Sequence, residues 1–172
     1  VPRARQTDDA SSTVLGPGTL TLADVSFSYP GTEARALSHI DIDIAPGTKL
    51  AIVGPSGAGK STLARLVTGL TPPSAGTIAL DGRDIATIPG PVLHRAIAYV
   101  PQEPMLFGRS VADNIAYGRP DATPAQIEAA ARAVGAHAFI VGLPHGYRSV
   151  LAESGRSLAA GQRQLLCLAR AL

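Results

Sequence analysis

The segment GPSGAGKS, residues 54–61, constrains the fold more than any other stretch of this chain. It has the spacing of a phosphate-binding loop, in which two glycines bracket a gap and lysine and serine follow. The apolar run at residues 50–53 precedes it and predicts a strand that is buried on both faces. Apolar residues then recur at helical spacing at Leu63, Leu66, Val67 and Leu70. The pattern predicts a strand, a loop and a helix of an α/β protein.

The residue types of this loop suit a phosphate group. Glycines allow the backbone to turn so that successive N–H groups face an anion, and the helix that follows adds the positive end of its dipole. Lys60 is one of only two lysines among 15 basic residues, and its compact ammonium can reach terminal phosphates. Ser61 supplies an oxygen ligand for Mg²⁺. The expected phosphate-loop residues are Gly54, Pro55, Ser56, Gly57, Ala58, Gly59, Lys60, Ser61 and Thr62.

The alternative interpretation of this loop is a glycine-rich turn that binds no ligand. At average glycine usage, a chance match in a chain of this length is expected at a frequency of about one per cent. The apolar strand before the loop and the amphipathic helix after it reduce that chance further. The sequence therefore favours nucleotide phosphate binding.

Length and composition set the class of protein. A chain of 172 residues with 45% hydrophobic and 16% charged residues is expected to form one globular domain or a little more. The formal net charge of +2 comes from scattered basic residues, which does not favour a nucleic-acid partner. The single cysteine, Cys167, excludes a disulfide within the chain, and its apolar helical surroundings predict a buried side chain. No apolar run approaches the about 18 residues of a membrane-spanning helix.

The two ends of the chain are unusual. Residues 1–18 begin with valine, are largely polar and are expected to be a linker. The chain ends at Leu172 in a helical pattern without a stop signal. We therefore expect it to be a piece of a longer polypeptide. The apolar face expected for this last helix consists of Leu165, Leu168, Ala169 and Leu172.

Strands are expected in the first hundred residues and helices in most of the rest. Residues 19–29 alternate apolar and polar side chains, with an irregularity near Ala23 and Asp24. Further strands are expected at residues 39–47, 76–82 and 96–102, the last of them buried. A helix is expected from Thr123, because Gln126 stands three residues later as in a capping box. Its expected buried face is Ile127, Ala131, Val134 and Ala138.

Three further stretches narrow the class of phosphate-binding protein. They are VSFSYPG at residues 25–31, EPMLFGRSVADNIAYG at 103–118 and ESGRSLAAGQRQLLCLARAL at 153–172. In order and separation they resemble the nucleotide-binding domain of an ATP-binding cassette (ABC) transporter, over residues 19–172. The resemblance implies a P-loop NTPase (ABC ATPase) core with an N-terminal antiparallel β subdomain, and a helical subdomain at about residues 103–172. SVADNIAYG favours the exporter type.

The resemblance also implies roles for single residues. Tyr29 stands where the family stacks an aromatic ring on adenine, although a tyrosine that merely ends a strand is the alternative. Gln102 corresponds to the Q-loop glutamine, which ligates Mg²⁺ and senses the γ-phosphate. Glu153 corresponds to an acidic residue that links to the membrane domains. The signature segment, which caps the ATP held by a partner domain, corresponds to Leu158, Ala159, Ala160, Gly161 and Gln162.

The chain departs from the family pattern in two places. Ala159 and Ala160 stand where serine and glycine are usual, and loss of the serine hydroxyl removes one hydrogen bond to the γ-phosphate. The Walker B strand, the catalytic glutamate and the switch histidine of the family follow the signature helix, beyond Leu172. We therefore expect an incomplete core sheet, and no turnover by this chain alone because it has no general base.

The expected function is the ATP-binding domain of an ABC exporter, which couples binding and hydrolysis of MgATP to transport. The implied partners are a second nucleotide-binding domain, identical or not, arranged head to tail, and a membrane domain contacted through Gln102 and Glu153. The implied location is the cytoplasmic face of the cell membrane. Two alternatives remain, an ATP-binding module without turnover and a soluble ABC-type ATPase of DNA repair or translation. The second is weaker because the chain has no basic patch and no coiled-coil insertion.

Overall fold

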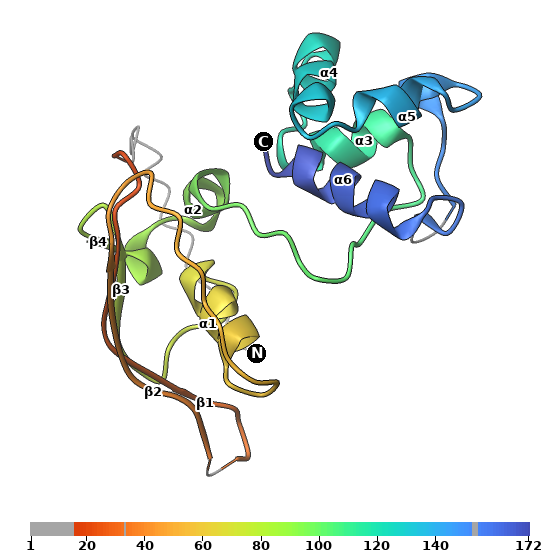
Figure 1. Cartoon of the computed structure of the whole chain (residues 1–172). Helices are drawn as coiled ribbons and strands as arrows, with labels where there is room; N and C mark the ends of the chain where they lie inside the picture. Colours follow the sequence, from red (N-terminus) through yellow and green to blue (C-terminus); the bar gives the residue numbers. More distant parts are fainter. Residues whose placement is uncertain (1–15, 33, 153–154) are drawn as a thin grey trace. The chain divides into compact units, whose positions relative to one another are not determined.

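The computed structural model describes residues 16–32, 34–152 and 155–172. These residues form two compact units that divide between Ile97 and Ala98, and each unit is described here by itself (Figure 1). Most of the predicted linker, residues 1–15, lies outside the described residues. In the described ranges, no helix combines the length and the apolar character that crossing a membrane requires.

The first unit contains an antiparallel four-stranded sheet of order β2-β1-β3-β4 (Figure 1). This finding confirms the N-terminal antiparallel β subdomain that the resemblance to the ABC family implied. The strands are β1 (Leu20–Ser28), β2 (Arg35–Ile44), β3 (Ala75–Leu80) and β4 (Arg83–Asp84).

The irregularity predicted in the first strand is a β-bulge. Pairing of β1 with β2 passes from Leu22 opposite Ile42 to Val25 opposite Ile40, so β1 holds one extra residue. Asp24 lies in this bulge with a φ of 50°, and its backbone N–H donates to Asp41 Oδ1 at 2.8 Å. The bulge keeps Leu22 and Val25 buried on either side of the kink.

The helix predicted after the phosphate loop is α1 (Lys60–Val67), and it packs with the sheet. Leu70 does not belong to its buried face, because Thr68 caps the helix and Leu70 is 52% exposed. A 3₁₀ turn, η1 (Ile85–Thr87), and α2 (Gly90–Ala96) complete the core. The buried cluster consists of Leu22, Val25, Phe27, Leu37, Leu63, Leu66, Ile78, Leu80, Ile85, Ile88 and Leu93.

Two predicted buried strands are wrong. Residues 50–53 form no strand, and the exposed fractions of Leu50, Ile52 and Val53 are 49%, 48% and 88%. Residues 96–102 form no strand either, and α2 ends at Ala96. A central strand needs a hydrogen-bonding neighbour, and the part of the chain described by the structure supplies none for these segments. The parallel part of the expected core sheet is therefore not formed here.

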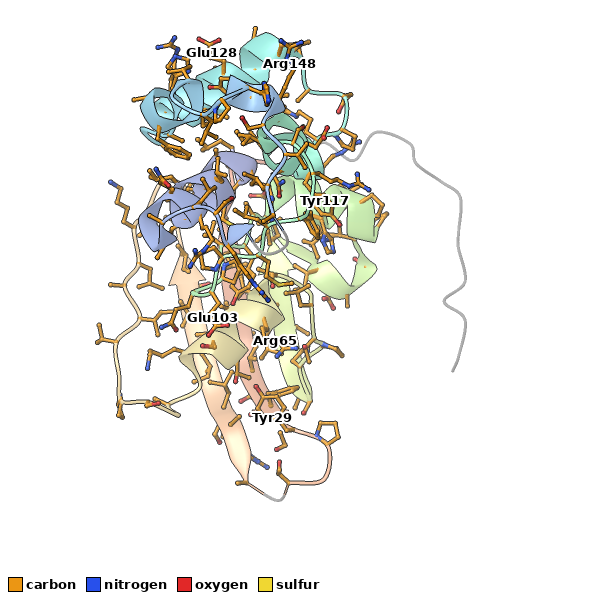
Figure 2. All side chains as sticks on the ribbon, turned by 90° about the vertical axis from the view of Figure 1, so that its right-hand side faces the viewer. Tyr29, Arg65, Glu103, Tyr117, Glu128 and Arg148 are labelled. Atoms are coloured by element: carbon orange, nitrogen blue, oxygen red, sulfur yellow. The ribbon has the colours of Figure 1, made fainter. Side chains whose placement is uncertain are left out.

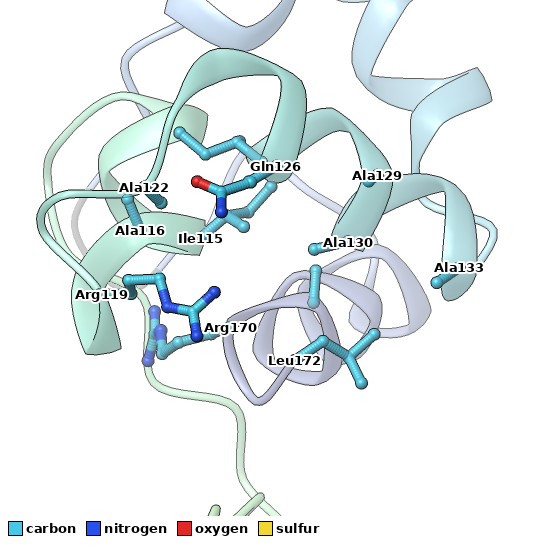
Figure 3. Close-up of a pocket in the computed structure, with 12 residues that line it drawn as sticks. Ile115, Ala116, Arg119, Ala122, Gln126, Ala129, Ala130, Ala133, Arg170 and Leu172 are labelled. Carbon is cyan, nitrogen blue, oxygen red and sulfur yellow. The ribbon is translucent and has the colours of Figure 1, made fainter. Parts of the chain in front are cut away.

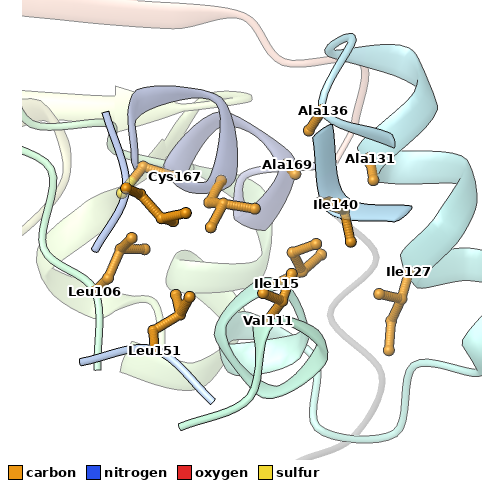
Figure 4. Close-up of a cluster of buried hydrophobic side chains, with 12 residues drawn as sticks. Leu106, Val111, Ile115, Ile127, Ala131, Ala136, Ile140, Leu151, Cys167 and Ala169 are labelled. Atoms are coloured by element: carbon orange, nitrogen blue, oxygen red, sulfur yellow. The ribbon is translucent and has the colours of Figure 1, made fainter. Parts of the chain in front are cut away.

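The second unit is helical. Its elements are α3 (Val111–Ile115), η2 (Ala116–Gly118), α4 (Pro124–Ala133), α5 (His137–Val141), η3 (Gly146–Arg148) and α6 (Ala160–Arg170). They surround a cluster of buried side chains, shown in Figure 4. The cluster consists of Leu106, Val111, Ile115, Ile127, Ala131, Ala136, Ile140, Leu151, Leu158, Leu166, Cys167 and Ala169.

The predicted start of α4 is confirmed. Thr123 Oγ1 accepts from the N–H of Gln126 at 3.3 Å, and Gln126 Oε1 accepts from the N–H of Thr123 at 2.8 Å. The helix ends before Gly135, which has a φ of 76°, so the turn leaves Ala138 exposed and buries Ile140. Ala138 is therefore not part of the buried face that the sequence pattern predicted.

The buried face of α6 also differs from the prediction. Leu166, Cys167 and Ala169 are buried, whereas Leu168 is 38% and Leu172 is 69% exposed. The spacing of leucines alone does not reveal which side α3 and α4 cover. Cys167 is 4% exposed, which confirms the predicted buried thiol.

Candidate nucleotide-binding site

The phosphate loop leads directly into α1, as its sequence predicts. Gly59 is the N-cap of α1, with a φ of 85°, and Lys60 is the first helical residue. As far as the structure describes the chain, no side chain caps this helix end. Backbone N–H groups of a first helical turn lack partners within the helix, and they favour an anion. The N-terminus of α1 can therefore bind an anion.

Gly59 also places the loop against β2. A Cβ atom at this position would lie 2.6 Å from the carbonyl oxygen of Ala36 and 2.8 Å from Leu37 Cδ2. Both distances are shorter than real Cβ contacts, so a side chain would displace the loop. Only glycine allows this approach together with a left-handed backbone.

The ammonium group of Lys60 folds over its own loop. Its Nζ donates to the carbonyl oxygen of Gly54 at 2.8 Å and to that of Pro55 at 2.7 Å. A lysine ammonium has three donors, so one donor remains beyond these two bonds. The loop thus holds a positive charge against its own carbonyl oxygens, with one donor left for an anion.

Ser61 and Thr62 follow Lys60 but lie in different surroundings. Ser61 is exposed, so its hydroxyl can serve as the oxygen ligand that Mg²⁺ prefers. Thr62 is only 7% exposed, and its Oγ1 lies 2.8 Å from the hydroxyl oxygen of Tyr29. Thr62 was predicted to belong to the phosphate loop, and no pattern in the sequence indicates its hydrogen bond to Tyr29.

Tyr29 lies beside the phosphate-loop helix. Its ring meets Phe27 edge-on, with centroids 5.0 Å apart and planes at 85°. Tyr29, which is labelled in Figure 2, is 43% exposed. The hydrogen bond to Thr62 fixes the ring relative to α1. The structure therefore brings together, in one unit, the aromatic ring and the phosphate loop that the sequence assigned to a nucleotide.

Two substitutions of Tyr29 distinguish the role of its ring from that of its hydroxyl group. In the complete protein we expect Tyr29→Ala to raise the Kd for ATP about tenfold to hundredfold, as loss of base stacking does. Tyr29→Phe keeps the ring and loses only the hydrogen bond to Thr62, and we expect a change of about threefold to fivefold. Titration with a fluorescent ATP analogue measures both. Equal affinity in wild type and Tyr29→Ala would contradict the stacking role.

The other predicted site residues belong to the second unit. Gln102 is exposed in the loop before α3, and Glu153 lies outside the described residues. Because Gln102 and the phosphate loop belong to different units, they are not described as one site. Their common action on Mg²⁺ therefore stays a prediction.

The signature segment begins α6. Leu158 is buried, Ala159 is the N-cap, and Ala160 is the first helical residue. Gln162 Oε1 accepts from the N–H of Ala159 at 3.0 Å. This contact is one half of a capping box, and the other half needs a hydroxyl that alanine lacks.

The start of α6 leaves room for a ligand. Gly161 is exposed, and a Cβ atom at this position would meet no described atom within 4 Å. Together with the N–H groups of the first turn, this open backbone surface can approach a phosphate.

A pocket of about 310 Å³ lies elsewhere in the second unit, between α3, α4 and α6 (Figure 3). None of the predicted site residues lines it. Small apolar side chains form most of its wall, and Figure 3 shows the polar side chains of Arg119, Gln126 and Arg170 among the lining residues. The apolar lining does not suit a nucleotide triphosphate. Its lining residues are Ile115, Ala116, Arg119, Ala122, Gln126, Ile127, Ala129, Ala130, Ala133, Ala169, Arg170 and Leu172.

Comparison with protein families identifies the fold and its class. The family model described as "ABC transporter" matches residues 37–172 of this chain. The chain belongs to the ABC transporter family. The predicted P-loop NTPase fold of the ABC type is thereby confirmed. The family implies that this domain binds a nucleotide, ATP.

The relatives of this ABC domain include a flippase and a secretion protein. It is 50% identical over 165 residues to an ATP-dependent lipid A-core flippase of Chromobacterium violaceum, covering 96% of this chain and 28% of that protein. It is 46% identical over 155 residues to the cyclolysin secretion/processing ATP-binding protein CyaB of Bordetella pertussis, covering 90% and 22%. The chain therefore spans less than a third of the length of these curated relatives.

A solved structure of an ABC exporter is also similar to this chain. A bacterial Atm1-family ABC exporter with ATP bound matches with a TM-score of 0.87 and 38% sequence identity, over 96% of this chain and 29% of that one. The resemblance to exporters that the sequence motifs indicated is confirmed by these neighbours.

Proposed function

We propose that this chain is the ATP-binding domain of an ABC exporter, in which binding and hydrolysis of MgATP drive transport across a membrane. The observation that carries the proposal is the phosphate loop. Gly59 leaves the start of α1 open, Lys60 holds its charge over the loop, and Tyr29 is tied to the same helix through Thr62. The exporter names of the relatives support transport as the output.

The residues of this chain have separate tasks in the proposed reaction. Lys60 and the N–H groups of α1 bind the terminal phosphates, and Tyr29 binds the base. Ser61 and Gln102 would ligate the magnesium ion, which neutralises charge on the phosphates. The segment 158–162 would contact the nucleotide held by a second domain, because α6 also begins with open N–H groups.

The proposal includes partners and a location. A second nucleotide-binding domain, identical or different, would complete each site in a head-to-tail arrangement. A membrane domain of the same transporter would contact the region of Gln102 and Glu153. The chain would then work at the cytoplasmic face of the cell membrane. The membrane exporters among its relatives support this arrangement.

The test of the proposed function is ATP hydrolysis by the complete transporter in membranes or detergent. Phosphate release should require both Mg²⁺ and ATP, and transport should stop when hydrolysis stops. A complete protein that binds MgATP without hydrolysing it would instead support the second candidate, a binding module without turnover. The alanine at position 159, where the family usually has serine, is the observation that favours this candidate.

Restoring the hydroxyl tests the signature segment. In the complete protein, Ala159→Ser should complete the capping box with Gln162 and add a donor for the phosphate, so we expect hydrolysis at that site to rise about tenfold. Steady-state phosphate release measures the rate. Ala125→Ser is the control, because this exposed alanine of α4 lies outside the signature segment. An unchanged rate in Ala159→Ser would mean that backbone N–H groups already suffice.

A further inference from the structure

Arg170, the last residue of α6, joins parts of the second unit that lie far apart in sequence. Its Nη1 donates to the carbonyl oxygen of Met105 at 2.9 Å. Its Nε donates to the carbonyl oxygen of Asn114 at 2.9 Å, and its Nη2 donates to Asn114 Oδ1 at 3.1 Å. One guanidinium therefore connects α6 both to the loop before α3 and to α3 itself.

The side chain of Asn114 extends this connection. It is fully buried, and its Oδ1 also accepts from the N–H of Phe107 at 2.8 Å. Its Nδ2 donates to the carbonyl oxygens of Phe107 and Ser110, both at 3.0 Å. A buried amide is stable only when its polar atoms have partners. Asn114 thus fixes the shape of the loop, and Arg170 attaches that loop to α6.

The charge of Arg170 is held by carbonyl oxygens and aromatic rings. Its guanidinium lies 5.3 Å from the ring centroid of Phe107 and 5.5 Å from that of Tyr117, and these two rings stack 4.4 Å apart. Among the ion pairs of the residues that the structure describes, none includes Arg170. The planar guanidinium of arginine can make these hydrogen bonds and stack on these rings at the same time, whereas a lysine ammonium would keep only some of these contacts.

The other end of α6 is also held in place. Arg163 Nη1 donates to the carbonyl oxygen of Leu158 at 2.7 Å, and Leu158 and Leu166 are buried in the core. The 11 residues of α6 form a rod about 16 Å long. The rod carries the signature segment at its start and the Arg170 contacts at its end. A displacement of the loop before α3 therefore has to move the signature segment as well.

We infer that Arg170 is a positioning residue for ATP hydrolysis, through which residues 105–107 and the signature segment 158–162 move as one body. Residues 105–107 lie shortly after Gln102, so this body links the two parts of the second unit that the proposed reaction uses. Arg170 acts through α6 and not by contact with the nucleotide. The inference rests on the proposed function, because it assigns α6 a task in that reaction.

Amide hydrogen exchange in the complete transporter tests the mechanical part, whether or not the protein hydrolyses ATP. Arg170→Met should raise exchange about tenfold at the hydrogen-bonded amides of both segments, Phe107 in residues 105–107 and Leu158 and Ala159 in residues 158–162, because the joint between them is lost. Arg170→Lys should show a smaller rise at both places. A rise confined to residues 105–107 would overturn the inference.

Arg132 offers a matched control in the same unit. Its side chain is 59% exposed, and its Nε and Nη2 donate only to Glu128 Oε1, one helical turn away, at 2.8 and 2.6 Å. This hydrogen bond, with the charge of Arg132, lowers the pKa of the Glu128 carboxyl. Arg132→Met removes the same charge as Arg170→Met and should leave exchange in both segments unchanged. An equal rise in this control would contradict a specific role for Arg170.

Kinetics separate positioning from a general loss of structure. Arg170→Met should lower kcat about tenfold to hundredfold by misplacing the signature segment, with the Kd for MgATP within about twofold of wild type. The kcat of Arg170→Lys should lie between those of wild type and Arg170→Met. This second variant keeps the test valid if Arg170→Met folds poorly. Wild-type kcat in both variants, or kcat and affinity falling together, would overturn the inference. A wild-type transporter without turnover would count against the proposed function, and hydrogen exchange would still decide the role of Arg170.

Discussion

Replacement of Lys60 by alanine in the complete protein should abolish most ATP hydrolysis. The ammonium lies 2.8 Å and 2.7 Å from two carbonyl oxygens of its own loop, where it can offer its remaining donor to a terminal phosphate. Loss of one charge-assisted hydrogen bond should weaken ATP binding about tenfold to hundredfold. Loss of the charge where negative charge develops should reduce kcat about a hundredfold or more. Phosphate release and nucleotide titration measure the two effects.

Lys49 provides the control for this substitution. It is the other lysine of the chain, it is exposed, and it lies outside the phosphate loop. We expect Lys49→Ala to keep wild-type affinity and rate. Lys60→Arg keeps the charge but brings a wide fork into a loop that holds a compact ammonium, so it should remain impaired. Full activity in Lys60→Ala would refute the assignment of the phosphate loop.

The 172-residue chain expressed alone should self-associate and release no phosphate from MgATP. Residues 50–53 expose large apolar side chains, with Val53 88% exposed, and they have backbone groups that no neighbouring strand pairs in the described structure. Exposed apolar segments with unpaired backbone groups promote aggregation. We expect no turnover, because the sequence motifs predict that the general base of the family lies outside this segment. Light scattering and phosphate release measure the two outcomes.

A variant sharpens this test. Val53→Ser should reduce self-association of the isolated chain, because it removes the most exposed of these apolar side chains. It should not restore turnover. Multiple turnovers by the wild-type isolated chain, abolished by Lys60→Ala, would show that another residue of this chain serves as the base.

The sequence alone determined the features that depend on neighbouring residues. The phosphate loop and the start of α1 follow from the glycines and Lys60, since the loop and helix cap span only a few residues. The capping box of Thr123 and Gln126 is local in the same sense. Alternation of apolar and polar residues predicted the strands at residues 19–29 and 39–47 and the irregularity near Asp24, whereas their antiparallel pairing was implied by the family resemblance. The motifs around this loop also indicated the family that the comparisons confirm.

Only the tertiary structure decided what depends on distant partners. Residues 50–53 are apolar enough for a buried strand, but a strand forms only where another strand offers hydrogen bonds. The helical spacing of α6 did not reveal that Leu166 is buried and Leu168 exposed. The buried side of α6 is determined by the helices that pack against it. The Tyr29 contact with Thr62 and the contacts of Arg170 join residues 33 to 65 positions apart. No local pattern encodes such pairs, so only the folded chain shows them.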